Sequence, residues 1–258
     1  MGIVNATPDS FSDGGKYNEV EAAVQHAKRL VEAGADIIDI GGESTRPNAE
    51  FVEPDEEIRR VVPVIEAIAK EVDVPISIDT YKPEVAKRAI EAGATIINDV
   101  WGAKWDRAMA AVAAEYDVPI ILMHNRKEPV YTNFIQDMVE DLKESIAICT
   151  EAGVRSENII LDPGIGFAKS HEQNLEAMRN LDVFVEFGYP VLLGTSKKSV
   201  IAKTLNLPVS ERLEGTGATV CYGIMKGCHI MRVHDVKEMS RMAKMMDVLL
   251  EKGVYVNG

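Results

Sequence analysis

Short apolar runs rich in isoleucine and valine alternate along the chain with longer stretches in which apolar residues recur every three or four positions. Runs of the first kind are typical of buried β-strands, and stretches of the second kind are typical of amphipathic helices. The strands predicted in this way are residues 2–6, 37–40, 76–78, 96–97, 120–123, 159–161, 191–193 and 230–233. Strands that alternate with helices indicate repeated βα units and a parallel sheet.

The number of units and the chain length together indicate the fold class. A length of 258 residues suits one closed α/β barrel better than two smaller domains. No stretch rich in Pro, Gly or Ser divides the pattern, so we predict a single (β/α)8 TIM barrel domain over residues 1–258. An open doubly wound sheet is the alternative, but no G-x-G-x-x-G fingerprint follows the first strand.

Composition argues against nucleic acid and membranes as partners. The formal net charge is 28 minus 41, or -13, which disfavours binding to nucleic acid. No apolar run reaches the roughly 18 residues of a membrane span and no secretory signal is present, so we expect a cytoplasmic protein without a membrane partner. The three cysteines, Cys149, Cys221 and Cys228, lack metal-ligand spacing, and we interpret them as free thiols.

All eight predicted strands end in polar residues. Active sites of α/β barrels lie at the carboxyl ends of the strands, so these endings are the place to look for chemistry. They are Asn5, Asp39 with Glu43, Asp79, Asn98 with Asp99, His124 with Asn125, Asp162, Ser196 with Lys197 and Lys198, and Arg232 with His234. Together they predict a polar mouth on an apolar barrel.

Three of these endings indicate a ligand that donates hydrogen bonds. Asp79, Asn98 and Asp162 directly follow apolar runs, where a buried polar group needs a partner. Two carboxylates and an amide suit the edge of a fused nitrogen heterocycle with an exocyclic amine, such as a pterin or a guanine. The alternative for Asp79 and Asp162 is that each caps the helix that follows.

A second group of residues suits an anion. Thr45, Arg46 and Pro47 follow the second strand, and Arg232 and His234 alternate by two after the eighth, so both are expected to point the same way beside Asn5. Guanidinium and imidazole groups suit phosphate oxygens, and the Asn5 amide suits Mg²⁺ beside a diphosphate. The loop 7–15 has the composition of a lid, in which we expect Phe11 to cover the substrate.

With these residues assembled, the chain resembles the dihydropteroate synthases, the folate-pathway family that sulfonamide drugs inhibit. The segments that carry the resemblance span nearly the whole chain, and each includes one of the strand ends. They are GIVNATPDSFSDGG, DIIDIGGESTRP, ISIDTYKPEVA, IINDVWG, ILMHNR, LDPGIGFAK, LLGTSKKS and RVHDV, in that order. The chain departs from the family's common residues at Ala6, Asn48 and Lys197, of which Lys197 replaces an arginine.

The resemblance implies a transferase that condenses a dihydropterin pyrophosphate with 4-aminobenzoate, releasing pyrophosphate, with Mg²⁺ as cofactor. It assigns the pterin to Asp79, Asn98, Asp162 and Lys198, the diphosphate and its metal to Asn5, Thr45, Arg46, Arg232 and His234, and aminobenzoate to Phe11, Pro47 and Ser199. The implied catalytic residues are Asp79, Lys198, Arg232 and His234.

The resemblance also implies a homodimer that forms through the last helices. The run Met239, Met242, Met245 and Met246 suits such an interface, and core packing is its alternative. Two other functions compete with the synthase: a methyltetrahydrofolate-binding barrel that serves a corrinoid protein, and a non-catalytic homologue that partners another folate enzyme. The anion-binding residues argue against the first alternative, and the intact polar strand ends argue against the second.

Overall fold

Eight strands form where the apolar runs predict them. The structure, a computed structural model, describes residues 1–6, 16–44 and 50–252. Its strands are β1 (Gly2–Asn5), β2 (Ile38–Gly41), β3 (Ile76–Asp79), β4 (Ile96–Asp99), β5 (Ile120–Met123), β6 (Ile159–Asp162), β7 (Leu192–Leu193) and β8 (Ile230–Met231).

Helices follow the strands and cover them on the outside. They are α1 (Lys16–Glu32), α2 (Pro54–Ile68), α3 (Pro83–Glu91), α4 (Ala108–Tyr116), α5 (Phe134–Glu151), α6 (His171–Arg179), α7 (Leu181–Val185), α8 (Ser199–Leu205), α9 (Leu213–Met225) and α10 (Val236–Leu249), with 3-10 turns η2 (Ser156–Asn158) and η3 (Val209–Glu211). No helix in the described ranges is long and apolar enough to cross a membrane.

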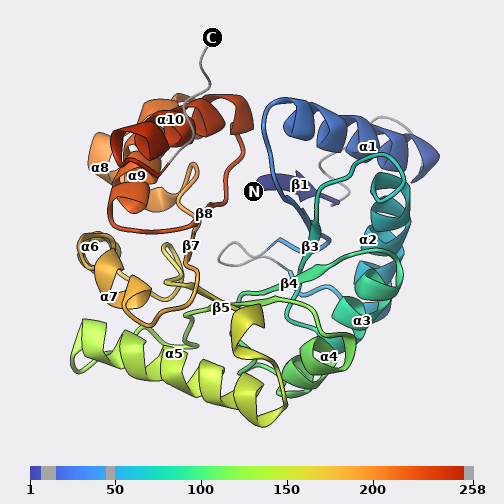
Figure 1. Cartoon of the computed structure of the whole chain (residues 1–258), viewed down its shortest axis with the longest axis horizontal. Helices are drawn as coiled ribbons and strands as arrows, with labels where there is room; N and C mark the ends of the chain where they lie inside the picture. The colour runs from blue at the N-terminus through green and yellow to red at the C-terminus, as the bar shows by residue number, and fades with distance from the viewer. Residues whose placement is uncertain (7–15, 45–49, 253–258) are drawn as a thin grey trace.

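The strands close into a ring. Strands β1 to β6 form one parallel sheet in chain order, and β7 pairs in parallel with β8. Single bridges complete the ring, because Gly2 of β1 pairs with Val233 and Leu161 of β6 pairs with Val191. Figure 1 shows the strands in the middle and the helices around them. The predicted (β/α)8 barrel is therefore confirmed and the open doubly wound sheet is wrong, while the single domain over 1–258 stays a prediction.

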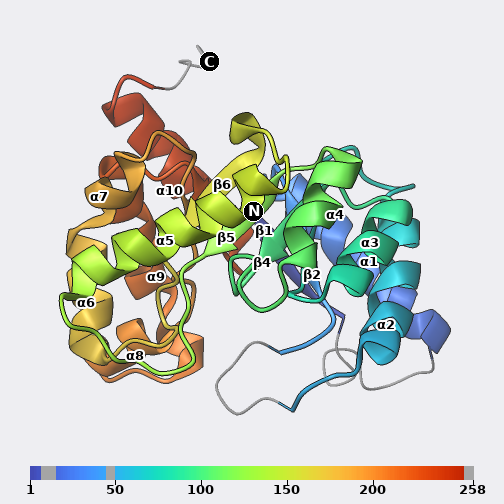
Figure 2. The same ribbon diagram turned by 90° about the horizontal axis from the view of Figure 1, so that it is seen from below.

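Helix α2 shows why these segments fold as they do. Pro54 stands in its first turn, where proline fits, and three acidic residues follow at the positive end of the helix dipole. Val61, Val64, Ile65 and Ile68 recur every three or four positions and are buried, so one face of the helix covers the sheet. In Figure 2, α1 to α4 lie on one side of the barrel and α6 to α10 on the other.

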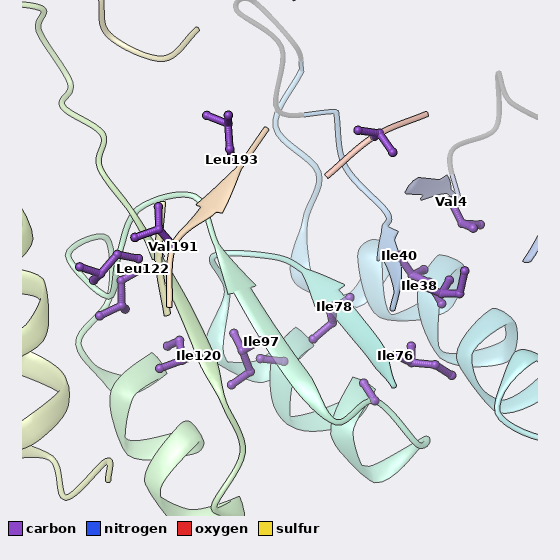
Figure 3. Close-up of a cluster of buried hydrophobic side chains, with 14 of the residues drawn as sticks. Val4, Ile38, Ile40, Ile76, Ile78, Ile97, Ile120, Leu122, Val191 and Leu193 are labelled. Carbon is purple, nitrogen blue, oxygen red and sulfur yellow. The ribbon is translucent and has the colours of Figure 1, made fainter. Parts of the chain in front are cut away.

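Alternation along each strand separates the core from the barrel interior. In β3, Ile76 and Ile78 face the helices, so Ser77 and Asp79 face inward. Figure 3 shows the outward aliphatic side chains of neighbouring strands, including Ile97 and Leu122, in one apolar layer. The strands therefore bury one face in a helix-covered core and present the other to the inside of the ring.

The barrel interior is apolar at one end and polar at the other. A separate cluster of Met1, Ile96, Ile121, Ile160 and Leu192 fills the end near the amino termini of the strands. Two residues after Ile37, Ile96 and Ile160, the polar residues Asp39, Asn98 and Asp162 stand above this cluster. The apolar layer closes the floor, so any ligand must enter from the carboxyl ends.

The strand ends differ from the prediction in one respect that concerns the site. Asp79 and Asn98 pair with each other in the sheet, and Asp162 pairs with Met123, so all three belong to the strands. Helix α3 begins only at Pro83 and α6 begins at His171, with Ser170 as its cap. Asp79 and Asp162 are too far from these helices to cap them, so the helix-cap alternative is wrong.

Candidate active site at the carboxyl ends of the strands

A partly buried arginine joins two buried carboxylates at the centre of the mouth. Arg232 Nε donates to Asp39 Oδ2 at 2.6 Å, and Arg232 Nη2 donates to Asp79 Oδ2 at 2.7 Å. Burial opposes the charge of Arg232, but Asp39 and Asp79 raise the pKa of the guanidinium above its ordinary value. Burial likewise raises the pKa of Asp79, against the effect of Arg232. The guanidinium is thus held as a fixed cation.

Asn98 and Asp79 complete the polar surface beside this arginine. Asn98 Nδ2 lies 3.4 Å from each carboxylate oxygen of Asp39. Asp79 Oδ1 is buried and accepts no hydrogen bond from the part of the chain that the structure describes. An unpartnered buried carboxylate oxygen is costly, so this atom calls for a donor that the described residues do not supply.

Asp162 and Lys198 both bind the loop that follows β6. Asp162 Oδ1 accepts the Gly164 backbone N–H at 2.7 Å, and Lys198 Nζ donates to the Ile165 carbonyl at 2.6 Å. The Lys198 ammonium also lies 4.8 Å from the centre of the Phe167 ring. Burial raises the pKa of Asp162 and lowers the pKa of Lys198 to about 8. Asp162 is buried and Lys198 is partly buried, so both groups are largely shielded from water.

His234 lies at the edge of the mouth and is held by a serine. Ser196 Oγ lies 2.9 Å from His234 Nδ1 and accepts the His234 backbone N–H at 3.2 Å. Because this hydroxyl already accepts one hydrogen bond, its own proton suits Nδ1, and the ring proton of His234 then stands on Nε2. Nearby, Ser199 begins α8 and is exposed, and Asn5 ends β1 and is exposed.

Comparison with known proteins agrees with this geometry. The model of the family described as pterin binding enzyme matches residues 1–234. A dihydropteroate synthase of Bacillus subtilis is 63% identical over 258 residues, which cover 100% of this chain and 90% of that protein. The chain belongs to the dihydropteroate synthases.

Solved structures of the family share the fold closely. A dihydropteroate synthase of Clostridium difficile, crystallised in the presence of pteroic acid, superposes with a TM-score of 0.94 at 51% identity, covering 96% of this chain and 95% of that one. The Xanthomonas albilineans synthase with 4-aminobenzoic acid gives a TM-score of 0.93 at 40% identity, covering 97% and 92%. The resemblance drawn from the motifs is confirmed, and the chain is a transferase of folate synthesis.

The structure connects several of the site residues expected from the sequence. The structure brings Asp79, Asn98 and Arg232 into one network, and it places Asp162 and Lys198 around one loop. Four of the expected residues, Phe11, Thr45, Arg46 and Pro47, lie outside the described residues. The roles of all these residues stay predictions.

Asp39 is the member of the network that sequence reasoning left without a role. It is fully buried, and its carboxylate binds Arg232 and lies against Asn98. The signal was present in the strand pattern, since Asp39 alternates with Ile38 and Ile40 and so must face the barrel interior. A carboxylate on that face needs a cation, and Arg232 supplies one.

The described residues fit a Mg²⁺ ion that the substrate itself helps to hold. They contain no group of three or more His, Cys, Asp or Glu side chains that could hold a metal alone. Mg²⁺ keeps several waters and often binds one or two protein oxygens together with substrate phosphates. The exposed Asn5 at the end of β1 supplies an amide oxygen of that kind.

Proposed function

We propose that the polar mouth performs the family's reaction, condensation of a dihydropterin pyrophosphate with 4-aminobenzoate, as follows. The pterin is held by Asp79, Asn98, Asp162 and Lys198, the diphosphate by Thr45, Arg46, Arg232 and His234, Mg²⁺ by Asn5, and aminobenzoate by Phe11, Pro47 and Ser199. The observation that supports the pterin site best is the buried Asp79 Oδ1 without a donor among the described residues, since a pterin edge carries N–H donors.

The chemistry asks for charge stabilisation more than for a base. The bond between the pterin methylene carbon and the diphosphate oxygen breaks, a bond to the arylamine nitrogen forms, and that nitrogen then gives up a proton. An arylamine is neutral near pH 7, so no strong base is needed. Arg232 has further N–H donors beyond the two that bind Asp39 and Asp79, and these suit the departing diphosphate.

Asp79 would stabilise positive charge on the pterin, whereas a bound Mg²⁺ would stabilise negative charge on the diphosphate. Asp79 stands where it favours positive charge that develops on the pterin, because its unpartnered oxygen is buried in a low-dielectric site. Mg²⁺, when bound, neutralises diphosphate oxygens. His234, which Ser196 holds, is assigned to the same anion.

Substitution of Asp162 tests the pterin site. Asp162→Asn keeps an acceptor for the Gly164 N–H but turns the other oxygen into a donor, which meets a donor on the pterin edge. We expect the affinity for a pterin analogue to fall at least about tenfold, with little change in melting temperature. Calorimetric titration measures the affinity, and unchanged binding would remove Asp162 from the site.

Release of pyrophosphate separates the synthase from both competing functions. A barrel that presents a methyl group to a corrinoid protein, or a non-catalytic partner, releases no pyrophosphate on mixing with both substrates. We expect the chain to release pyrophosphate only when the dihydropterin pyrophosphate and 4-aminobenzoate are both present. The cytoplasmic location expected from the sequence stays a prediction.

We further propose that a second copy of the chain covers the α8–α10 face. Met239 is buried, and Met242 and Met246 pack partly on the core, so the core-packing alternative holds for these three methionines. Met245 and other large apolar side chains of these helices are exposed, namely Leu205, Met225 and Leu249. Exposed apolar side chains on neighbouring helices suit a protein interface.

The oligomeric state tests this surface. Leu249→Glu should shift the chain toward the monomer in sedimentation equilibrium, because a carboxylate at a buried apolar contact is costly. The matched control is Val130→Glu, an exposed apolar residue between β5 and α5. A monomeric wild-type chain, or equal behaviour of the two variants, would contradict the proposal.

A further inference from the structure

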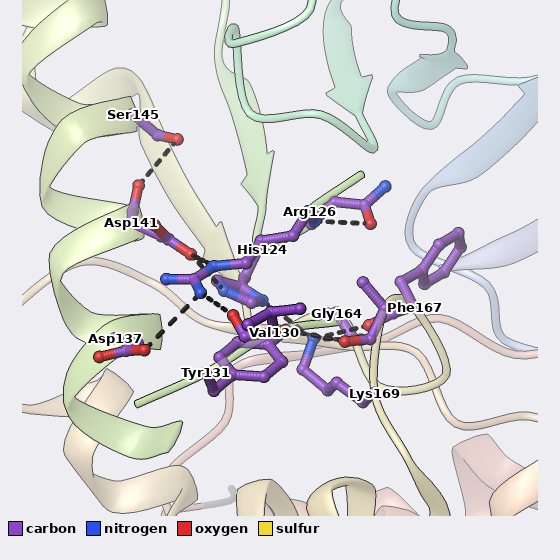
Figure 4. Close-up of polar contacts among 12 residues, drawn as sticks. His124, Arg126, Val130, Tyr131, Asp137, Asp141, Ser145, Gly164, Phe167 and Lys169 are labelled. Atoms are coloured by element: carbon purple, nitrogen blue, oxygen red, sulfur yellow. Dashed lines mark hydrogen bonds and ion pairs between the residues drawn. The ribbon is translucent and has the colours of Figure 1, made fainter. Parts of the chain in front are cut away.

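Lys169 lies outside the proposed site but uses every proton of its ammonium group. Its Nζ donates to the carbonyls of Gly164 at 2.9 Å and Phe167 at 3.0 Å, and it lies 2.9 Å from His124 Nδ1. Two of these three partners belong to the short loop that joins β6 to α6, called here the 164–169 loop. Figure 4 shows the Lys169 ammonium between this loop and His124.

His124 contacts the Lys169 ammonium, and Asp141 in turn contacts His124. His124 is completely buried, and its Nε2 lies 2.9 Å from Asp141 Oδ2 on α5. A carboxylate only accepts, so Nε2 carries the ring proton and Nδ1 is left to accept from Lys169. Burial lowers the pKa of His124 to about 4, which agrees with a neutral ring. Arg126 Nε donates to the same Asp141 oxygen at 2.5 Å and fixes the carboxylate.

The backbone of the 164–169 loop also binds two residues of the proposed pterin site. Asp162 accepts the N–H of Gly164, and Lys198 donates to the carbonyl of Ile165. Gly166 packs so closely that a Cβ there would stand 3.1 Å from the Lys198 side chain. Displacement of the loop would therefore move the hydrogen-bond partners of both Asp162 and Lys198 together.

We propose that Lys169, supported by His124 and Asp141, is a positioning residue that holds the 164–169 loop so that Asp162 and Lys198 meet the pterin. The lysine does not touch the substrate in this arrangement. Its effect passes through two backbone carbonyls on one side and an imidazole of fixed tautomer on the other. The inference rests on the pterin site proposed above.

Comparison of two ligands tests this role. In Lys169→Met the side chain keeps its length but loses all three donors. We expect the affinity for a pterin analogue to fall about tenfold, while the affinity for pyrophosphate with Mg²⁺ stays within about twofold, because its proposed residues lie on other strands. Turnover should show a raised KM for the dihydropterin pyrophosphate with a smaller change in kcat. Lys169→Arg keeps the charge and donors and should restore part of the pterin affinity.

A lysine of similar chemistry and no proposed role provides the control. Lys70 is exposed just after α2, and Lys70→Met should bind both ligands as the wild type does. Wild-type pterin affinity in Lys169→Met would overturn the inference, and so would an equal loss of both ligands, which indicates a general structural defect. If Asp162→Asn also binds pterin normally, the fault lies with the pterin site itself, and the inference about Lys169 falls with it.

Discussion

At the scale of single residues, the site depends on charged side chains that stabilise one another inside the barrel. Asp39 and Asp79 would be isolated carboxylates inside the barrel without Arg232, and Arg232 would be an isolated guanidinium without them. This arrangement changes what a mutation at Arg232 reports. The residue was expected to serve the diphosphate alone, yet its bond to Asp79 couples it to the proposed pterin site as well.

Removal of the Arg232 side chain should therefore destabilise the fold in addition to slowing turnover. We expect Arg232→Ala to lower the free energy of unfolding by about 3–5 kcal/mol, because two buried carboxylates lose their partner. Arg232→Lys should recover only part of this, since a point charge does not reproduce the paired hydrogen bonds. Urea unfolding at neutral pH measures both variants, and a loss below about 1 kcal/mol in Arg232→Ala would show that the network contributes little.

At the scale of elements, the loop between β6 and α6 is the segment on which several functional groups depend. Gly164 has a φ of +67°, and a Cβ built there would lie 2.1 Å from the His124 carbonyl oxygen. Only glycine permits both the left-handed backbone and the close approach to β5. The loop is therefore fixed by its backbone as well as by Lys169.

Gly153 and Gly164 both have a left-handed backbone, and substituting each one distinguishes the effect of backbone strain from the effect of a steric clash. Gly153, after α5, has a φ of +93° and nothing within 4 Å of an added Cβ. We expect Gly153→Ala to lower stability by about 1–2 kcal/mol from backbone strain alone. Gly164→Ala should cost about 2–5 kcal/mol and also weaken pterin binding, because the loop must move away from His124. Similar losses of stability in the two variants, with normal pterin affinity, would contradict this view.

At the scale of the whole molecule, burial of titratable groups links stability to pH. His124 is neutral in the folded protein because burial lowers its pKa to about 4, whereas the unfolded chain has the ordinary value of 6.5. The unfolded state therefore binds more protons between these values. The contribution of neutral His124 is fully present above pH 6.5 and is lost as the pH falls toward 4.

The variant His124→Gln should remove this part of the pH dependence. Between about pH 7.5 and about pH 5, the wild type should lose about 2 kcal/mol more stability than His124→Gln does. Denaturant unfolding of both proteins at the two pH values gives this difference directly. If both proteins lost stability in parallel, His124 would not carry a depressed pKa.

The repeated strands and helices, and the polar residues at the carboxyl ends of the strands, follow from the sequence alone. Alternation within segments such as Ile76–Asp79 is a local property, because side chains two apart share a face of a strand whatever lies opposite. Eight such segments, with polar residues at each end, were sufficient to predict the barrel and the position of its mouth. The motifs along the chain were sufficient to indicate the family.

Which polar groups meet depends on the closed barrel. Arg232 and Asp39 are 193 positions apart, and Lys169 and His124 are 45 apart, so no local pattern links either pair. Ring closure brings β8 beside β1 through the pairing of Val233 with Gly2, and parallel register sets β6 beside β5. Strands β3 and β6 also run one residue further than apolarity indicated, because the sheet pairing continues through Asp79 and Asp162. Pairing of buried charges is a property of the closed barrel, since burial makes an unpaired charge costly only once the ring has formed.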